Sequence, residues 1–361
     1  MVNINNGDYM TNKGIYNFFL FMSTLTRGLV EVFSVIFLYN LGYSINNILL
    51  FLLIMYISGI LVNYCSLVVN TKIVLIISSI LYGISYLYLS IMNNSIFNLI
   101  LFAILLSFSS YSYHVIRHYL AMKMVDYDKG KNINVILIVM YGAVILSNLV
   151  GIVLVNKLSI MINSVIIMFL SIIFIIPILK LDNIQDKKIT FKNIKITKDK
   201  ITFSILEQFK VILMEIQPLF VYLYINKSMY YVGIFNVVIN LASLIVMLFI
   251  TKKIKKHHFK YTNLLLCLIL ILKLNMKGSI MLLFIALFEG IGMKIYEKFS
   301  LDNLYDLDKN QVNSYLLLEE FIFFGSKSFI MSIFFFVIKD IKIILYICII
   351  GIFISSFYLK D

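Results

Sequence analysis

The chain has 361 residues, of which 61% are hydrophobic and 14% are charged, and its mean hydropathy is +0.96. A soluble globular domain usually carries about 25% charged residues, so this composition excludes an ordinary soluble fold. The apolar residues form runs of roughly 20, the length at which a helix crosses a hydrocarbon core, and not the alternating segments of about ten that membrane barrels use. The sequence therefore predicts an all-α, polytopic membrane protein.

Apolar runs separated by charged turns predict twelve membrane-spanning helices. Lys13 is the only basic residue near the N-terminus and no small-residue cleavage site follows, so we expect the first run to remain as a spanning helix. The ninth is the shortest, and we expect its Lys273 to extend to an interface. The predicted helices cover residues 15–40, 46–69, 72–91, 96–120, 133–155, 158–179, 202–225, 230–250, 259–274, 278–296, 313–337 and 341–359.

The loop charges predict the orientation of these helices. Of the 31 Lys and Arg residues, 22 fall on the side of the N-terminus and six on the opposite side. Cytoplasmic loops of membrane proteins carry the excess of basic residues, so both termini are expected in the cytoplasm of a prokaryotic plasma membrane. The same excess explains the net charge of +13 without a nucleic-acid partner.

The longest hydrophilic stretch divides the chain into two sets of six helices. We predict an N-terminal bundle at 1–180, a basic cytoplasmic linker at 181–201 and a C-terminal bundle at 202–361. Shifting the halves by 184 residues lays Glu31 over Glu215. Chance alignment of apolar runs is an alternative explanation, but parallel six-helix repeats are typical of two-halved secondary transporters.

This architecture resembles the major facilitator superfamily. The resemblance rests on the two sets of six helices, the basic central linker, the short outer loops and the segments 33–44 and 218–224, which are similar to opening helices of bacterial members. It implies two six-helix bundles that rock about a central cavity lined by helices 1, 4, 7 and 10.

The sequence departs from the motifs of that superfamily. Of the usual signature between helices 2 and 3, only Gly59 remains, with Asn63 in place of the acid and a lone Lys72. The proline of the antiporter motif is absent, and the small residues that remain in the segment 141–143 and at Gly151 favour close helix packing. Arg117 is the candidate for the arginine that members often carry on helix 4.

Ionisable residues inside the predicted spans are the main candidates for function. A charge at the bilayer centre costs at least about 2.5–3.5 kcal/mol, so it is retained for a reason. Arg27 and Glu31 are four residues apart, which places them on one helical face where they can pair. Glu215 lies three residues before Pro218, and Glu289 is followed by a glycine. These four charged residues are the predicted transport and proton-coupling residues, with structural ion pairs as the alternative.

Further charged residues are secondary candidates. The deep positions hold more acids than bases, which favours exchange of a proton or binding of a cationic group by an unpaired acid. His114 and His118 could bind a metal, but no third ligand is evident, so an interfacial cluster is the simpler interpretation. The secondary candidates are Arg117, Lys210, Glu319, Glu320 and Lys327.

These observations favour a non-enzymatic secondary active transporter that works by alternating access. We expect proton-coupled efflux of a small organic or amphipathic solute by a monomer in contact with membrane lipids, without a metal or cofactor. The alternatives are an uptake symporter, a flippase for a lipid-linked glycan or peptide, and a transporter-like scaffold. A membrane glycan polymerase or glycosyltransferase is remote, because such enzymes need a large outer loop and the outer loops here are short.

Overall fold

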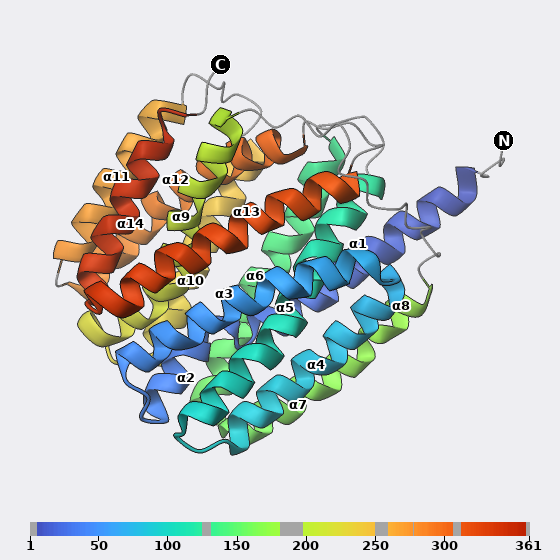
Figure 1. Ribbon diagram of the computed structural model, residues 1–361, viewed down its shortest axis with the longest axis horizontal. Helices are drawn as coiled ribbons and strands as arrows, with labels where there is room; N and C mark the ends of the chain where they lie inside the picture. Colours follow the sequence, from blue (N-terminus) through green and yellow to red (C-terminus); the bar gives the residue numbers. More distant parts are fainter. Residues whose placement is uncertain are drawn as a thin grey trace.

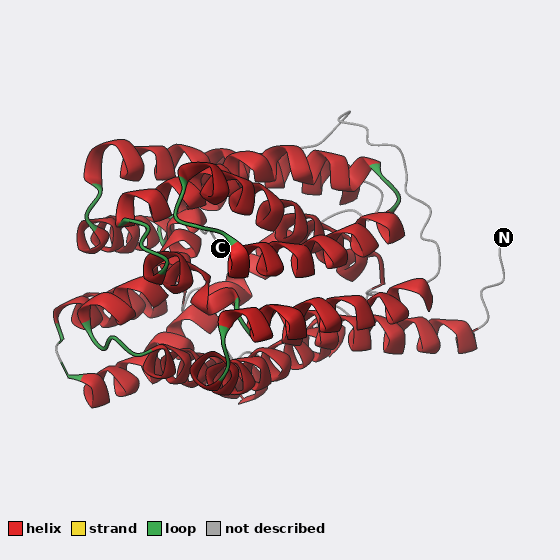
Figure 2. Ribbon diagram, turned by 90° about the horizontal axis from the view of Figure 1, so that it is seen from below, coloured by secondary structure: helices red, strands yellow, loops and turns green. Residues whose placement is uncertain are grey.

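The computed structural model describes residues 6–124, 131–180, 198–249, 259–276, 278–305 and 312–358, and the regular structure within these ranges is helical (Figures 1 and 2). Residues 181–197 of the predicted linker lie outside the described residues, and its last four residues belong to α9. The helices are α1 (Asn6–Gly28), the 3-10 turn η1 (Glu31–Phe33), α2 (Ser34–Asn40), α3 (Ile45–Val68), α4 (Thr71–Ile91), α5 (Ile96–Met124), α6 (Lys131–Lys157), α7 (Ile160–Ile173), α8 (Ile175–Lys180), α9 (Lys198–Tyr224), α10 (Met229–Phe249), α11 (Phe259–Asn275), α12 (Ser279–Tyr305), α13 (Val312–Ile333), the π-helical turn η4 (Phe334–Ile338) and α14 (Ile341–Ser355).

The helices carry the properties of a membrane protein. Among the described residues, nine helical segments are long and apolar enough to cross a membrane. Helices α9, α11 and α14 pack among them; α14 is apolar but short, and α9 holds several charged residues. Large apolar side chains such as Leu61, Phe169 and Phe329 are exposed on the outside of the helices, where a soluble protein would place polar groups.

Side-chain caps explain why most predicted helix starts are correct within a few residues. Ser44, Asn70, Ser159 and Asp340 each accept a hydrogen bond from a backbone N–H in the first turn of the following helix. These residues lie in short turns between apolar runs. The polar residues that separate the apolar runs of the sequence therefore also cap the helices that follow them.

The first predicted helix, 15–40, is not continuous. Helix α1 ends at Gly28, and the chain passes through Leu29 and Val30 before η1 and α2 resume. The break frees backbone carbonyls in the middle of a 27-residue apolar segment. The Arg27 carbonyl accepts a hydrogen bond from the Tyr82 hydroxyl at 3.0 Å. Such partners are required because an unpaired carbonyl is costly in the membrane interior.

Two glycines allow α6 to pack closely against this break. A Cβ atom at Gly151 would lie 2.4 Å from the Leu29 carbonyl oxygen, and one at Gly28 would lie 2.0 Å from Ser147 Oγ. Both distances are shorter than van der Waals contact. Gly151 of α6 therefore provides the predicted close helix packing, at the place where the first segment is broken, whereas a Cβ atom at Gly142 would meet no atom within 4 Å.

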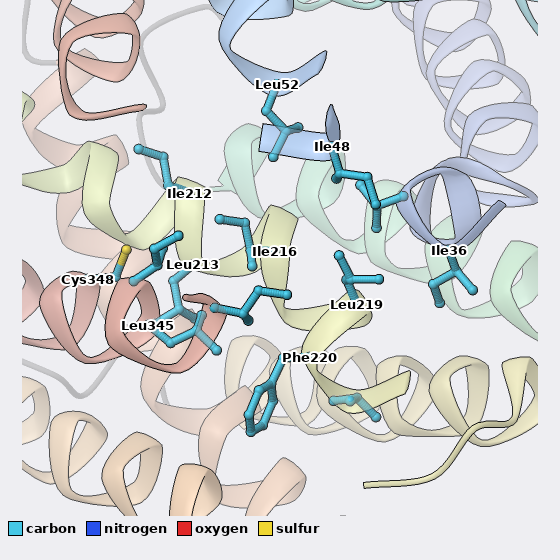
Figure 3. Packing of buried hydrophobic residues seen from close by; sticks show 14 of the residues in the cluster. Ile36, Ile48, Leu52, Ile212, Leu213, Ile216, Leu219, Phe220, Leu345 and Cys348 are labelled. Carbon is cyan, nitrogen blue, oxygen red and sulfur yellow. The ribbon is translucent and has the colours of Figure 1, made fainter. Parts of the chain in front are cut away.

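Helices α1–α8, the N-terminal group, and helices α9–α14, the C-terminal group, occupy different parts of the molecule (Figure 1). Contacts of α3 with α13, of α6 with α10 and of α2 with α9 join the groups. Figure 3 shows Leu219 of α9 lying toward Ile48 and Ile36 of the N-terminal group, and Leu213 toward Leu345 of α14. Helix α9 thus has an apolar surface on each side.

The close approach at the helix break predicts that Gly151→Ala destabilises the protein. The added methyl group would overlap the backbone carbonyl of Leu29, and overpacking of this kind costs about 1–3 kcal/mol. The melting temperature of the detergent-purified protein can be followed with a thiol-reactive dye, because Cys267 and Cys348 are buried. Gly142→Ala, in the same helix, is the matched control, because a methyl group added there would meet no atom within 4 Å. Equal melting temperatures of the two variants would contradict this packing.

Candidate functional site between the two helix groups

The break in the first segment places Glu31 at an accessible position. Glu31 is the first residue of η1, and its side chain is exposed although the residue lies within a membrane-spanning segment. It interacts electrostatically with Arg27, Arg117 and Glu215, which lie on α1, α5 and α9. Among the described residues, no ion pair or hydrogen bond holds its carboxylate. Glu31 therefore faces the space between the helix groups.

Arg27 does not form the ion pair with Glu31 that their spacing predicted, because the helix ends between them. Its Nη2 atom donates to the backbone carbonyl of Ser109 at 3.0 Å. Its guanidinium group lies 4.3 Å from the ring centre of Tyr82 and 4.2 Å from that of Tyr113. The charge of Arg27 is therefore held by α4 and α5 within the N-terminal group.

Glu215 connects the two groups. The Tyr56 hydroxyl of α3 donates a hydrogen bond to the Glu215 carboxylate of α9. The Lys327 ammonium of α13 interacts electrostatically with Glu215 and lies 5.4 Å from the Tyr56 ring centre. Two of the predicted residues, Glu215 and Lys327, are thus brought together by a tyrosine that was not among the predicted residues, because a single Tyr among 24 carries no distinguishing pattern in the sequence.

Tyr111 of α5 lies beside both acids. Its side chain is partly exposed, and it interacts electrostatically with Glu31 and Glu215. Its ring packs edge-on against Phe324 of α13 at 4.4 Å between ring centres. No hydrogen bond to its hydroxyl is present among the described residues. Tyr111 therefore offers a free polar group between the helix groups.

Farther along α5, His114, Arg117 and His118 form a basic cluster. The Arg117 Nη2 atom lies 3.0 Å from His114 Nδ1 and 3.3 Å from His118 Nε2. All three side chains are partly exposed. Within the described part of the chain, no carboxylate forms an ion pair with Arg117, although Glu31 and Glu320 interact with it electrostatically. The guanidinium therefore lacks a direct anionic partner there.

A second hydrogen bond joins the groups between α6 and α12. The Tyr141 hydroxyl donates to Glu297, whose other partner is the Lys294 ammonium at 2.9 Å. Lys294 is 1% exposed, so it belongs to the interior of the protein. Glu297 was not among the predicted residues either, because hydropathy places it near a helix end.

Glu289 lies in a buried ion pair within the C-terminal group. Its carboxylate is 2.8 Å from the Lys273 ammonium, which also donates to Gln217 Oε1 at 2.8 Å. Glu289 and Lys273 are 1% and 2% exposed. The position of Lys273 near the end of a short helix predicted that its side chain extends to a membrane interface. That prediction is wrong, because the side chain is buried in the ion pair.

The remaining secondary candidates occupy separate positions. Lys210 forms an ion pair with Glu207 at 3.6 Å. Glu320 is buried and interacts electrostatically with Lys327, seven residues away, as their spacing allows. Glu319 is also buried, and one of its carboxylate oxygens has no hydrogen-bond partner among the residues that the structure describes. Among the described residues, no three His, Cys, Asp or Glu side chains gather as a metal site would require.

We expect the Lys273–Glu289 pair to act in stability. Lys273→Met or Glu289→Gln alone leaves the other partner buried without its counter-charge, which costs about 3–5 kcal/mol. The double variant removes both charges, so most of the lost stability should return. The thiol-dye melting temperature of the three variants measures this coupling. A double variant as unstable as the sum of the single variants would contradict the pairing.

The comparisons with known proteins concern the whole chain. No protein-family model and no curated protein sequence matches it. Among solved structures, it is similar to a crystal structure of a point mutant of the nucleoside transporter NupG, with a TM-score of 0.69 and 14% sequence identity over 96% of this chain and 98% of that one. At this identity the likeness establishes the fold. The chain is therefore an all-helical integral membrane protein with the fold of that transporter structure, and the sequence predicted an all-helical membrane fold.

Proposed function

We propose that the chain is a secondary active transporter that carries a small solute across the membrane by alternating access. The fold is that of a transporter, and both helix groups contribute polar side chains to the space between them. A transporter of this kind binds its solute between two bundles and exposes the site to each side in turn.

The accessible carboxylate of Glu31 is the observation that carries this proposal. A structural charge in a membrane interior would be expected to have a partner, as Lys273 and Glu289 have. Glu31 forms no ion pair or hydrogen bond through its carboxylate among the described residues, and the helix break leaves its side chain exposed. Interrupted helices in transporters expose binding groups near the middle of the membrane. The chain thus keeps an acid that is energetically unfavourable in the membrane interior, at a position that a solute or a proton would reach.

Glu31 and Glu215 together are the proposed coupling groups. They lie on opposite helix groups and interact electrostatically. Repulsion between two carboxylates is relieved when one binds a proton or when a cationic group lies between them. Tyr56 donates to Glu215 and orients it, so movement of α3 relative to α9 changes the environment of that acid. Proton exchange would then depend on the conformation of the protein.

Contacts near one end of the bundle provide the proposed gate on that side. The Tyr222 hydroxyl of α9 donates to Asn40 Oδ1 of α2 at 3.2 Å, and the rings of Tyr222 and Tyr39 lie 6.4 Å apart. These contacts hold the first and seventh spanning segments together beside the α2–α3 and α9–α10 turns. These contacts and the Tyr141–Glu297 contact of α6 and α12 are formed together in this structure, and alternating access requires that each set separate at one stage of the cycle.

We expect Glu31→Gln and Glu215→Gln to abolish solute-driven proton movement. The amide keeps the shape of the side chain but exchanges no proton at neutral pH. Purified protein in liposomes with an internal pH dye reports proton flux when solutes from a panel of amines, amino acids, nucleosides and peptides are added. Initial flux toward either side also gives the direction of transport, efflux or uptake.

Glu319→Gln is the matched control, because Glu319 is a buried acid in a spanning helix whose electrostatic partners among the described residues do not include Glu31 or Glu215. It should retain the wild-type flux. Undiminished coupling in both the Glu31 and the Glu215 variants would contradict their proposed role. Absence of flux with every solute of the panel would contradict the transport function itself.

Linking the two sides of the gate should stop transport. With the three native cysteines replaced by serine, we expect Asn40→Cys and Tyr222→Cys to be joined by a short bis-maleimide, since these side chains are in contact. The linked protein should bind solute but not release it on the far side. A linked protein that transports at the unlinked rate would show that these helices need not separate.

A further inference from the structure

We infer that the transported solute is a zwitterion, with an ammonium group that binds at Glu31 and a carboxylate or other anionic group that binds at Arg117. This inference rests on the proposed transport function and names the chemical class of the solute. It follows from two oppositely charged side chains, the exposed Glu31 and the partly exposed Arg117, which interact electrostatically and which each form no ion pair among the described residues.

The acidic end of the proposed site consists of Glu31 and Glu215. The nearest base in sequence, Arg27, is buried and bound to the Ser109 carbonyl, so it does not form an ion pair with Glu31. Lys327 lies beside Glu215 and over the Tyr56 ring. An ammonium group of the solute would thus supply the direct ion pair that Glu31 does not form among the described residues.

The basic end is Arg117 with the two histidines that flank it. Both imidazoles lie within hydrogen-bond distance of the same Nη2 atom, and within the described ranges no hydrogen bond engages the Nη1 or Nε atom of Arg117. A guanidinium group presents five N–H donors in a fork that fits a carboxylate or phosphate. Glu320 interacts with Arg117 electrostatically but is buried and forms no ion pair with it. The free donors of Arg117 are therefore suited to an anionic group of the solute.

Tyr111 lies on α5, the helix that also carries Arg117. It interacts electrostatically with both acids of the acidic end, and Arg117 follows it by six residues, a rise of about 9 Å along the helix. A solute with one charge would satisfy one end and leave the other charge uncompensated in a site of low dielectric. A zwitterion compensates both, and the partly exposed Tyr111 hydroxyl can bond a polar group between its charges.

Binding of ω-amino acids to the detergent-purified, full-length protein tests this inference. 6-Aminohexanoate carries both charges, whereas hexylammonium and hexanoate carry one each on the same chain. Isothermal titration calorimetry should give an affinity for 6-aminohexanoate at least about tenfold above that for either analogue. 4-Aminobutanoate and 8-aminooctanoate then vary the separation between the charges, and one length should bind best.

Variants show which residue binds each charged end of the solute. Glu31→Gln should weaken binding of 6-aminohexanoate and hexylammonium and leave hexanoate unchanged. Arg117→Gln should weaken binding of 6-aminohexanoate and hexanoate and leave hexylammonium unchanged, and Arg117→Lys should restore part of that loss because it keeps the charge. Glu319→Gln is the matched control and should bind all three compounds as the wild type does. Thiol-dye melting confirms that each variant is folded.

Three outcomes would overturn the zwitterion inference. These are hexylammonium or hexanoate binding as tightly as the zwitterions, no binding of any of the five compounds, and transport of a neutral solute such as uridine that is unchanged by Glu31→Gln and Arg117→Gln. The last outcome would leave the proposed transport function intact. Conversely, charge-dependent binding without flux of any solute in liposomes would overturn the transport function and leave the zwitterion site standing.

Discussion

The cost of placing a charge in a membrane interior is the constraint on which the inside of this protein depends. The chain retains several such charges, and most are compensated nearby. Lys273 pairs with Glu289, and Lys294 pairs with Glu297. Within the described part of the chain, Arg27 forms no ion pair with a carboxylate, but it donates to a backbone carbonyl and lies against two tyrosine rings. These arrangements fix helices to one another, since each partner lies on a particular helix face and an unpaired charge is costly.

Glu31 differs from the buried acids Glu319 and Glu320, because its side chain is exposed and forms no ion pair or hydrogen bond among the described residues. Its position depends on the interruption of the first segment after Gly28, which ends the helical turn that would have joined Glu31 to Arg27. Gly151 accommodates the backbone at that interruption, and Tyr82 satisfies one of the freed carbonyls. Tyr82 of α4 and Gly151 of α6 thus stabilise an irregular backbone that leaves the Glu31 side chain exposed. This coupling of packing to an accessible polar group is a feature expected of a site that binds or exchanges ligands.

The two helix groups meet through large apolar surfaces and a few polar contacts. Helix α9 contributes both kinds, because Leu219 packs toward α2 and α3 while Glu215 accepts from Tyr56. Apolar surfaces can slide or separate at modest cost in a membrane, whereas a hydrogen bond between defined atoms favours one arrangement. The Tyr56–Glu215 and Tyr141–Glu297 contacts therefore define the observed arrangement of the groups, and charged partners of both acids lie within the C-terminal group.

The sequence by itself determined the all-helical membrane fold and nearly all helix positions, because runs of apolar residues and capping residues such as Ser44 and Asp340 are local signals. It also identified Glu31, Glu215 and Lys327 as unusual, since a charged residue within an apolar run can be recognised from the sequence alone. Only the tertiary structure decided which charges are paired. Lys273 and Glu289 lie on different helices, and Tyr56 and Glu215 are 159 residues apart, so no spacing rule relates them. The helix break at Leu29 likewise depends on a neighbouring glycine of α6, a contact that local sequence does not encode.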